Sequence, residues 1–168
     1  FGGYVNADHL IAFRGTDDDF DTDNGYSGIN QFGLGVRDSA YYDLTYGATS
    51  GGSTSEGFES DNDASGSAST PQTNAIFTNV TAIGPYRGNT SNTIAAGYRR
   101  GARIRRNSAI DIRNSIFMDF QRGIHIDGTP CETNATNGLI LYKNNIVAGN
   151  SPGKVTERNS TSTFNIQA

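Results

Sequence analysis

The stretch DDDFDTD, residues 17–23, holds the densest group of chemically active side chains in the sequence. Its five aspartates are Asp17, Asp18, Asp19, Asp21 and Asp23. Carboxylates this close together raise one another's pKa or recruit a cation, because each charge disfavours ionisation of its neighbours. Calcium suits such a group because it takes about six to eight oxygen ligands in flexible geometry. The stretch therefore indicates a calcium site, or carboxylates used in acid–base chemistry.

The same motif recurs further along the chain. GFESDND, residues 57–63, aligns with DFDTDNG, residues 19–25, and weaker copies occur in GARIRRN (101–107) and GIHIDGT (123–129). The aligned pairs of the first two copies include Phe20 with Phe58, Asp21 with Glu59, and Asp23 with Asp61. Apolar residues alternate with charged or polar residues in each copy. We interpret the copies as one short strand that returns in each unit of an internal repeat.

Other β-like segments lie between the copies, among them AIFTNVTAIG, AIDIRNSIFMDF and LILYKNNIVAGN. In these three segments Asn79, Asn114 and Asn144 occur in register, each before an alternating apolar strand. Arg103 and His125 lie 22 residues apart, whereas the earlier copies are separated by longer segments rich in Gly, Ser, Thr and Asn. A short minimum repeat length, with some repeats lengthened by inserted segments, is typical of a coiled solenoid in which some turns carry loops.

We therefore predict an all-β fold, a right-handed parallel β-helix of about four to five turns. Residues 1–168 form a single segment of it, with long inserted loops near residues 45–56 and 85–100. An antiparallel sandwich would also contain many short strands. It would give no reason for one motif to recur at the same phase of each unit, so the β-helix is favoured.

In such a coil the acidic motif has an inner and an outer face. Side chains alternate along a strand, so Phe20 and Thr22 face the core while Asp21 and Asp23 face outward. Successive turns, about 4.8 Å apart, stack the outward residues into two ladders. The first ladder is Asp21, Glu59, Arg103 and His125, and the second is Asp23, Asp61, Arg105 and Asp127. We expect His125 to face solvent on this ladder.

The predicted ligands of calcium are the carboxylates of these ladders and their neighbours. They are Asp17, Asp18, Asp19, Asp21, Asp23, Glu59, Asp61 and Asp63. A solvated acidic surface is the alternative, in which Arg103 and Arg105 pair with carboxylates of the preceding turn. Two arginines cannot neutralise about eight carboxylates, and this count favours the cation.

Composition narrows the class of partner. The net charge is −4, which argues against a nucleic-acid partner. No apolar run reaches membrane-spanning length, and Cys131 is alone, so no disulfide forms within the chain. An Asn-rich sequence with few lysines suits a secreted or cell-surface β protein. We also expect the chain to be part of a longer protein. Nothing in the terminal sequences FGGYVN and FNIQA looks like a cap, and open strand edges aggregate, so we expect a neighbouring domain or subunit to cover at least one end of the coil.

The segments HLIAFRGTDDDFDTDNGYSG, GFESDNDASG and RRNS resemble uncharacterised secreted β-helix proteins of Bacteroidetes-type bacteria. That resemblance covers most of the chain. More distantly, DDDFD is similar to the DDGWD-type calcium segment of pectate lyases that carry a parallel β-helix. The pectate-lyase resemblance implies Asp17, Asp18 and Asp21 as calcium ligands, with Glu59 and Asp61 added by the next turn.

Three classes of function follow. The first is a non-catalytic, calcium-rigidified surface module with a structural, adhesive or polysaccharide-binding role. The second, implied by the pectate-lyase resemblance, is a calcium-dependent lyase of uronate glycans, in which Arg103 or Arg105 would have to remove a proton. The third is a glycosidase that uses the carboxylates Asp21, Asp23, Glu59 and Asp61. An arginine stays charged and is a poor base, so we expect the first class.

Overall fold

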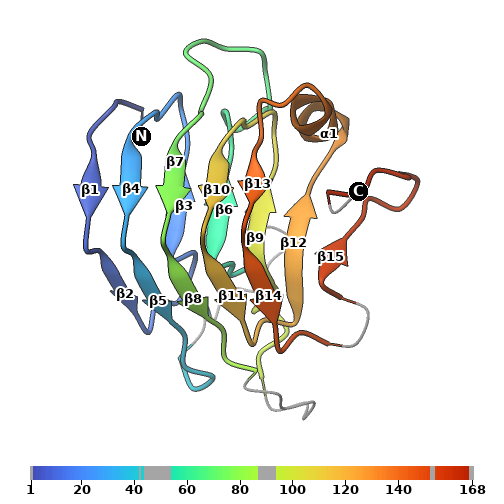
Figure 1. The fold of residues 1–168 in the computed structure, drawn as a ribbon. Coiled ribbons are helices and arrows are strands. Elements are labelled where there is room, and N and C mark those ends of the chain that lie inside the picture. The colour runs from blue at the N-terminus through green and yellow to red at the C-terminus, as the bar shows by residue number, and fades with distance from the viewer. Residues whose placement is uncertain (1, 42, 44–53, 87–93, 152–153, 167–168) are drawn as a thin grey trace.

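The chain coils into five rungs, each built from one strand of each of three parallel sheets (Figure 1). The computed structural model describes residues 2–41, 43, 54–86, 94–151 and 154–166. The predicted right-handed parallel β-helix is confirmed, with five rungs where four to five were expected. Each rung runs from the first sheet to the second and then to the third.

The first sheet contains β1 (Ala7–Asp8), β4 (Ile29–Gln31), β7 (Ile76–Thr78), β10 (Asp111–Arg113) and β13 (Tyr142–Lys143). The second contains β2 (Ile11–Phe13), β5 (Leu34–Val36), β8 (Thr81–Ile83), β11 (Ile116–Met118) and β14 (Ile146–Ala148). The third, which we call the ladder sheet, contains β3 (Phe20–Thr22), β6 (Phe58–Ser60), β9 (Arg100–Ile104), β12 (Arg122–Ile126) and β15 (Thr156–Glu157). The single helix of the described residues, α1 (Thr129–Thr136), joins β12 to β13.

The corner between the first two sheets depends on a left-handed residue in every rung. Positive φ angles occur there at His9, Phe32, Asn79, Asn114 and Asn144. Asparagine tolerates this conformation better than most residues, because its short polar side chain can bond locally. The segments that carry the three asparagines are therefore two strands joined at a corner, rather than the single strand expected from sequence.

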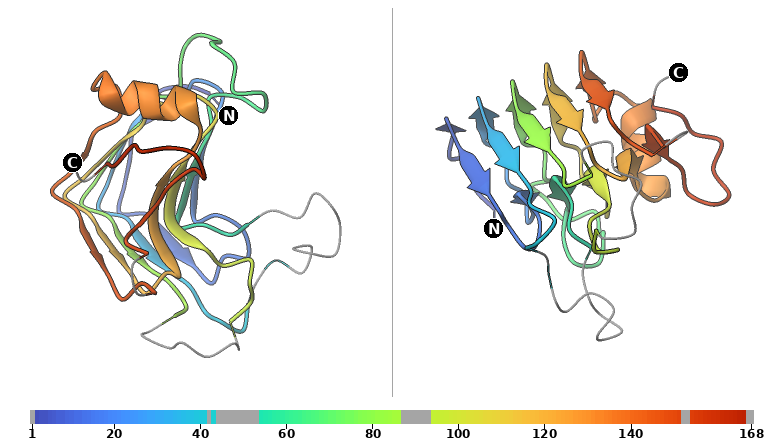
Figure 2. Two further views of the ribbon diagram at one scale, coloured as in Figure 1. Left: turned by 90° about the vertical axis from the view of Figure 1, so that its right-hand side faces the viewer. Right: turned by 90° about the horizontal axis from the view of Figure 1, so that it is seen from below.

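Two long segments leave the coil at one corner. Residues 37–57 and 84–99 both join the second sheet to the ladder sheet, in the second and third rungs. Both predicted loops, near residues 45–56 and 85–100, fall in these connections. Residues 44–53 and 87–93 lie outside the described part of the chain. Figure 2 shows the described ends of both segments on the same side of the coil, beside the ladder sheet.

The interior is a stack of side chains from successive rungs. Phe20 pairs in register with Phe58, and their ring centroids lie 4.9 Å apart. Phe58 also contacts Phe77 at 4.9 Å and Phe117 at 5.5 Å, so one ring joins three rungs and all three sheets. The predicted stacking of Phe20 on Phe58 inside the coil is confirmed. Aromatic pairs of this kind add about 0.5–1.5 kcal/mol each beyond the area that they bury.

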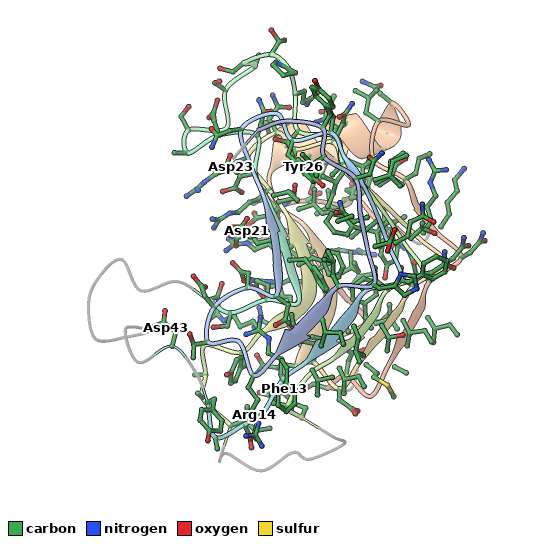
Figure 3. The ribbon with its side chains drawn as sticks, turned by 90° about the vertical axis from the view of Figure 1, so that its left-hand side faces the viewer. Phe13, Arg14, Asp21, Asp23, Tyr26 and Asp43 are labelled. Atoms are coloured by element: carbon green, nitrogen blue, oxygen red, sulfur yellow. The ribbon has the colours of Figure 1, made fainter. Side chains whose placement is uncertain are left out.

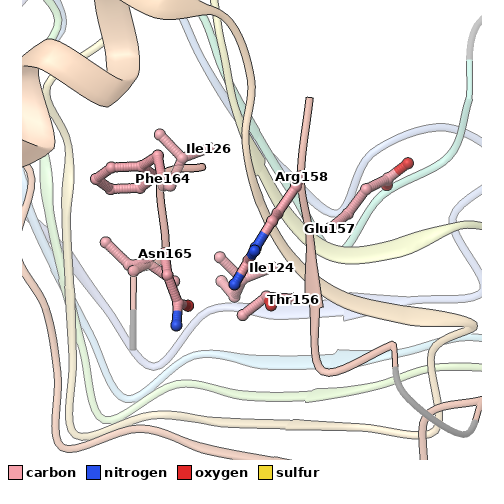
Figure 4. Close-up of a pocket in the computed structure, with 8 residues that line it drawn as sticks. Ile124, Ile126, Thr156, Glu157, Arg158, Phe164 and Asn165 are labelled. Carbon is pink, nitrogen blue, oxygen red and sulfur yellow. The ribbon is translucent and has the colours of Figure 1, made fainter. Parts of the chain in front are cut away.

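The two ends of the coil differ. The first rung exposes large apolar side chains, including Ile11 (72%) and Phe13 (63%). At the other end Phe164 and Ile166 pack against the core, and Figure 4 shows Phe164 beside Ile126 over the last rung. The expectation that nothing in the C-terminal sequence caps the coil was therefore wrong, because the alternating apolar residues of that sequence fold back onto the interior. Coverage of an end by another domain or subunit stays a prediction.

None of the helical structure within the described residues has the length and apolar character needed to cross a bilayer.

Candidate functional site

The outer face of the ladder sheet carries the predicted ladders of charge. Register pairs Asp21 with Glu59, Glu59 with Arg103, and Arg103 with His125, as expected. The first ladder also continues one rung further, because His125 pairs with Glu157. Figure 3 shows Asp21, in β3, and Asp23, just after β3, projecting on the outer side of this sheet.

Ion pairs join the two ladders across rungs two, three and four. Arg105 bonds both oxygens of Asp61, at 2.7 and 3.1 Å, and also pairs with Glu59. Arg103 places two nitrogens, at 2.8 and 2.6 Å, on one oxygen of Asp127. Planar guanidinium groups suit this multidentate recognition of carboxylates. The arginines of the ladder are therefore held in place by carboxylates on both sides.

These ladders are more buried than the sequence suggested. Glu59 and His125 are each only 5% exposed, and Asp61 is 6% exposed. His125 was expected to face solvent, but Asn159 of the last rung lies against its ring, with Nε2 3.1 Å from Oδ1. Burial lowers the pKa of His125, although the charge of Asp127 opposes that shift. The imidazole is consequently neutral near pH 7.

A third, deeper row of charge lies next to the ladders, at the end of the strands nearest the inserted segments. Arg100 bonds Glu56 at 2.7 Å and also pairs with Glu157, which Arg122 contacts as well. Arg37 bonds Asp19 at 2.9 Å, and both side chains are fully buried. Four members of the site were not predicted from the sequence: Arg37, Glu56, Arg100 and Arg122. Extending the repeat alignment backward by three residues, from Asp21 to Asp18 and from Glu59 to Glu56, would have found the carboxylate of this row.

Side chains of the protein hold three of the eight predicted calcium ligands, Asp19, Asp61 and Asp63, while Glu59 pairs with Arg105 and Asp18 accepts a bond of 2.6 Å from the Glu56 N–H. Asp19 is paired with Arg37, as described above. Asp61 is bound by Arg105 and by Arg106, whose Nη1 lies 2.7 Å from it. Asp63 accepts bonds from Ser65 and Ser67 within its own loop, and these bonds lower its pKa. These three carboxylates are therefore occupied by protein groups.

The remaining predicted ligands gather at rungs one and two. Among the described residues, Asp17, Asp18, Asp21 and Asp23 form no ion pair with an arginine or lysine. Glu59 pairs with Arg105 through Oε2, but its Oε1 is buried and has no hydrogen bond. The excess of negative charge on the face is thus confined to one end of it, which we call the acidic end. It consists of Asp17, Asp18, Asp21, Asp23 and Glu59.

The electrostatics of the acidic end reflect this excess. Burial, followed by the charge of Glu59, raises the pKa of Asp18 to about 8. Burial raises the pKa of Glu59 to about 7, although Arg105 opposes the shift. The pKa of Asp21 is also raised, by burial and by the charges of Asp61 and Asp23. Clusters of perturbed carboxyl groups on one face are typical of functional sites.

The carboxylates of the acidic end are of the right chemical type to bind a hard cation, but their side chains are not arranged as a metal site in this structure. No group of three or more His, Cys, Asp and Glu side chains in the described part of the chain is arranged closely enough to hold a metal ion. Carboxylate oxygens are nevertheless the ligands that calcium prefers. The buried Oε1 of Glu59 has no hydrogen bond, and its nearest cation, Nη1 of Arg103, lies 3.8 Å away. Asp17, Asp18, Asp21 and Glu59 are the residues that would hold such an ion.

The structure gives Arg103 and Arg105 roles in ion pairs. Burial opposes the charge of Arg105, but its bond to Asp61 and the charges of Glu59 and Asp61 outweigh burial and raise its pKa. A guanidinium held between carboxylates cannot accept a proton near neutral pH. Removal of a substrate proton by Arg105 is therefore chemically unfavourable, and Arg103 is similarly held by Asp127.

Comparison with known proteins assigns the chain to a family. The sequence model of the pectate-lyase-like β-helix domain matches residues 1–167. No curated protein and no solved structure gives a significant match. The family match covers nearly the whole chain and agrees with the five rungs of three parallel strands. The chain belongs to the pectate-lyase-like β-helix domain family.

Proposed function

We propose that this chain is a calcium-binding module that recognises an acidic polysaccharide outside the cell. The observation that carries the proposal is the acidic end. Its aspartates have no cationic partner among the described residues, and the buried Oε1 of Glu59 has no hydrogen bond. A buried polar atom without a partner costs about 1–3 kcal/mol, and more when it is charged. A bound cation would remove that cost.

Calcium would also relieve the repulsion between neighbouring carboxylates. Burial and the charge of Glu59 raise the pKa of Asp18, and burial and the charge of Asp61 raise the pKa of Glu59, so the folded chain disfavours the ionised form of both. A divalent cation favours ionisation of its ligands, so binding would lower both pKa values. Oxygen ligands from β3 and from the adjoining rung would then be bridged by one ion.

A polysaccharide suits the shape and charge of this face. Five rungs spaced by about 4.8 Å form a long surface with a repeating presentation of side chains. The inserted segments 37–57 and 84–99 leave the coil beside it (Figure 2). Calcium ions commonly keep open positions that a ligand carboxylate can occupy, so a uronate sugar is the natural partner of the acidic end. The low lysine content and the lone, buried Cys131 are compatible with a secreted or cell-surface location.

Hydrolysis of a glycan is the second candidate, and one observation favours it. Asp18, with a pKa raised to about 8, stays protonated at neutral pH, as a general acid must be. The nearby carboxylates could then supply the base. Calcium on Asp18 would deprotonate it, so the two functions make opposite demands on the same group. Cleavage that calcium inhibits and EDTA restores would favour the hydrolase.

Calcium titration tests the proposal. Calcium should raise the midpoint of thermal unfolding of the wild-type chain over its value in EDTA, by an amount that grows with concentration. At a hundredfold excess over Kd, the gain in stability is about 2.7 kcal/mol. Asp18→Asn combined with Asp21→Asn should abolish the response. The double variant should also melt no lower than wild type in EDTA, because it removes unpaired charge.

The matched control is Asp8→Asn, which changes an exposed aspartate on the first sheet, 70% exposed in its side chain. This variant should respond to calcium as the wild type does. Affinity electrophoresis in gels with and without a uronate polysaccharide then tests the ligand. Retardation that needs calcium supports the proposal. An unfolding midpoint that calcium leaves unchanged would overturn it and leave the aspartates as a solvated surface.

A further inference from the structure

A second, oppositely charged pocket lies further along the same face. It has a volume of about 320 Å³ and is lined by Arg103, Arg105, Arg106, Asp127 and parts of two adjoining segments. The side chains of the three arginines are 22%, 18% and 41% exposed. Three guanidinium groups thus reach one open cavity, and a single carboxylate, Asp127, shares its wall.

The arginines have donors left over after their ion pairs are counted. Each guanidinium carries five N–H donors and no acceptor. Arg106 uses only Nη1 on Asp61, and Arg105 uses Nε and Nη2 on Asp61. Arg103 uses Nε and Nη2 on Asp127. Within the described residues, Nη1 of Arg103, Nη1 of Arg105 and Nη2 of Arg106 have no hydrogen bond, although Nη1 of Arg103 lies 3.8 Å from Oε1 of Glu59. Each arginine therefore has an N–H group that can donate to a ligand.

The carboxylates that pair with these arginines leave the potential of the cavity positive. Asp61 and Glu59 are 6% and 5% exposed, and neither lines the pocket. The three cations therefore line the cavity, whereas of their partner carboxylates only Asp127 does.

The remaining walls are backbone that approaches closely. Gly66, with φ +69°, lies against Arg106, and a Cβ on it would be 3.0 Å from the Arg106 Cα. Opposite, Gly128 and Pro130 bring the start of α1 to the pocket. Gly128 has no side chain to cap the helix, and Pro130 lies in its first turn. The N-terminal end of a helix carries partial positive charge, which adds to that of the arginines.

We propose that this arginine pocket binds a tetrahedral oxyanion, namely a sulfate ester on the polysaccharide. One arginine fork satisfies a planar carboxylate, whereas three guanidinium groups round a cavity match an anion that presents oxygens in several directions. The assignment of the sulfate to a polysaccharide rests on the proposed function. Binding of the free anion does not, because it needs neither calcium nor sugar.

Inorganic sulfate is the probe, titrated into the whole chain in EDTA and followed by calorimetry and by NMR of the arginine side chains. Chloride replaces sulfate at equal ionic strength in the reference titration, because sulfate also stabilises proteins generally by exclusion. The wild-type chain should bind sulfate saturably. Arg106→Gln should weaken binding about tenfold, the effect of one lost charge-assisted bond of roughly 1.5 kcal/mol.

Arg113→Gln is the matched control. Arg113 also pairs with an aspartate, Asp111, and is 40% exposed in its side chain, against 41% for Arg106, but it lies on the first sheet. Sulfate affinity within twofold of wild type in this variant, with the loss in Arg106→Gln, supports the pocket. Absence of saturable binding to the wild type, or equal loss in both variants, would overturn it.

Oligosaccharides then identify the source of the anion. A sulfated oligosaccharide should bind more tightly than its desulfated form, and Arg106→Gln should abolish that preference. A uronate oligosaccharide without sulfate should be insensitive to Arg106→Gln. If only the uronate form responded to this substitution, the pocket would be a carboxylate subsite and the sulfate proposal would be wrong. Failure of calcium binding would leave the sulfate titration in EDTA unaffected.

Discussion

The ladder sheet has an acidic end and, further along, a part that carries Arg103, Arg105 and Arg106, which we call the arginine end. The two have the same backbone conformation and opposite electrostatics. Both belong to one sheet of parallel strands in continuous register. At the arginine end, Arg105 and Arg103 bind carboxylates of the two neighbouring rungs. At the acidic end, Asp17, Asp18, Asp21 and Asp23 form no ion pair with an arginine or lysine among the described residues, and Glu59 alone is paired with Arg105. Equivalent ladder positions therefore differ in whether charge is balanced within the protein.

This difference separates charge that stabilises the fold from charge that is left for a ligand. A buried carboxylate with a well-placed arginine needs nothing further, and removing either member leaves an uncompensated charge. When a carboxylate has no such partner, burial and neighbouring negative charge raise its pKa, as they do for Asp18. It gains by binding a cation. Substitutions at the two ends should accordingly act in opposite directions on stability.

The largest effect is expected at the buried row beside the arginine end. Arg100→Met removes the partner of Glu56, which is fully buried. Loss of one member of a buried pair costs about 3–5 kcal/mol. Denaturation in urea should therefore show a large decrease in the free energy of unfolding. Adding Glu56→Gln should recover part of the loss, because no charge is then left unpaired. A decrease below about 1 kcal/mol, the range of exposed pairs, would show that this pair is not structural.

An intermediate effect of opposite sign is expected at Asp18. Its pKa is about 8 in the folded chain against an ordinary value of 3.8, so the folded state binds the proton more tightly than the unfolded state. The contribution of Asp18 to the free energy of unfolding is therefore fully present below pH 3.8, its ordinary pKa, and is lost as the pH rises toward 8. Asp18→Asn should remove much of this loss and stabilise the chain at high pH by about 2 kcal/mol in EDTA.

Urea unfolding of both proteins across this pH range, in EDTA throughout, checks the sign of this effect of pH on stability. Wild type should lose stability with rising pH more steeply than Asp18→Asn, and the two should converge at low pH. Parallel curves would mean that Asp18 ionises freely and that the acidic end carries no excess charge.

The smallest effect is expected at Arg106, the most exposed arginine of the pocket. Arg106→Gln leaves Asp61 bound to Arg105, so the variant should lose about 1 kcal/mol or less. High salt should narrow the difference from wild type, because it screens exposed pairs. A loss as large as that of Arg100→Met would show that the exposed arginine is structural, and would remove the distinction between the pocket and the buried row.

The repeat pattern predicted the coil and its register. Alternation in DFDTD and FESDND placed Phe20 on Phe58 and Asp21 beside Glu59, and both pairings are confirmed. Such predictions succeed because side-chain direction in a strand has a period of two. The ladder from Glu59 through Arg103 to His125 is confirmed for the same reason.

Residues outside that period could not be placed in the same way. Arg37 belongs to an inserted segment, so nothing in its local sequence indicates that it reaches Asp19. Burial of His125 depends on Asn159, 34 residues later. The three-sheet rung was missed because the corner at Asn79 takes one residue with a positive φ, and so leaves no gap between two apolar strands. Long-range contacts and single-residue corners carry no periodic pattern.

The corner between the second sheet and the ladder sheet gives this coil a modular character. Connections of different length, residues 37–57 and 84–99, leave it there without shifting the pairing of the rungs on either side. Doubling the length of a flexible loop costs only about 0.6 kcal/mol of closure entropy. Additional sequence at this corner would therefore reshape the border of the charged face while its ladders keep their spacing. Recognition specificity could diversify there without redesign of the core.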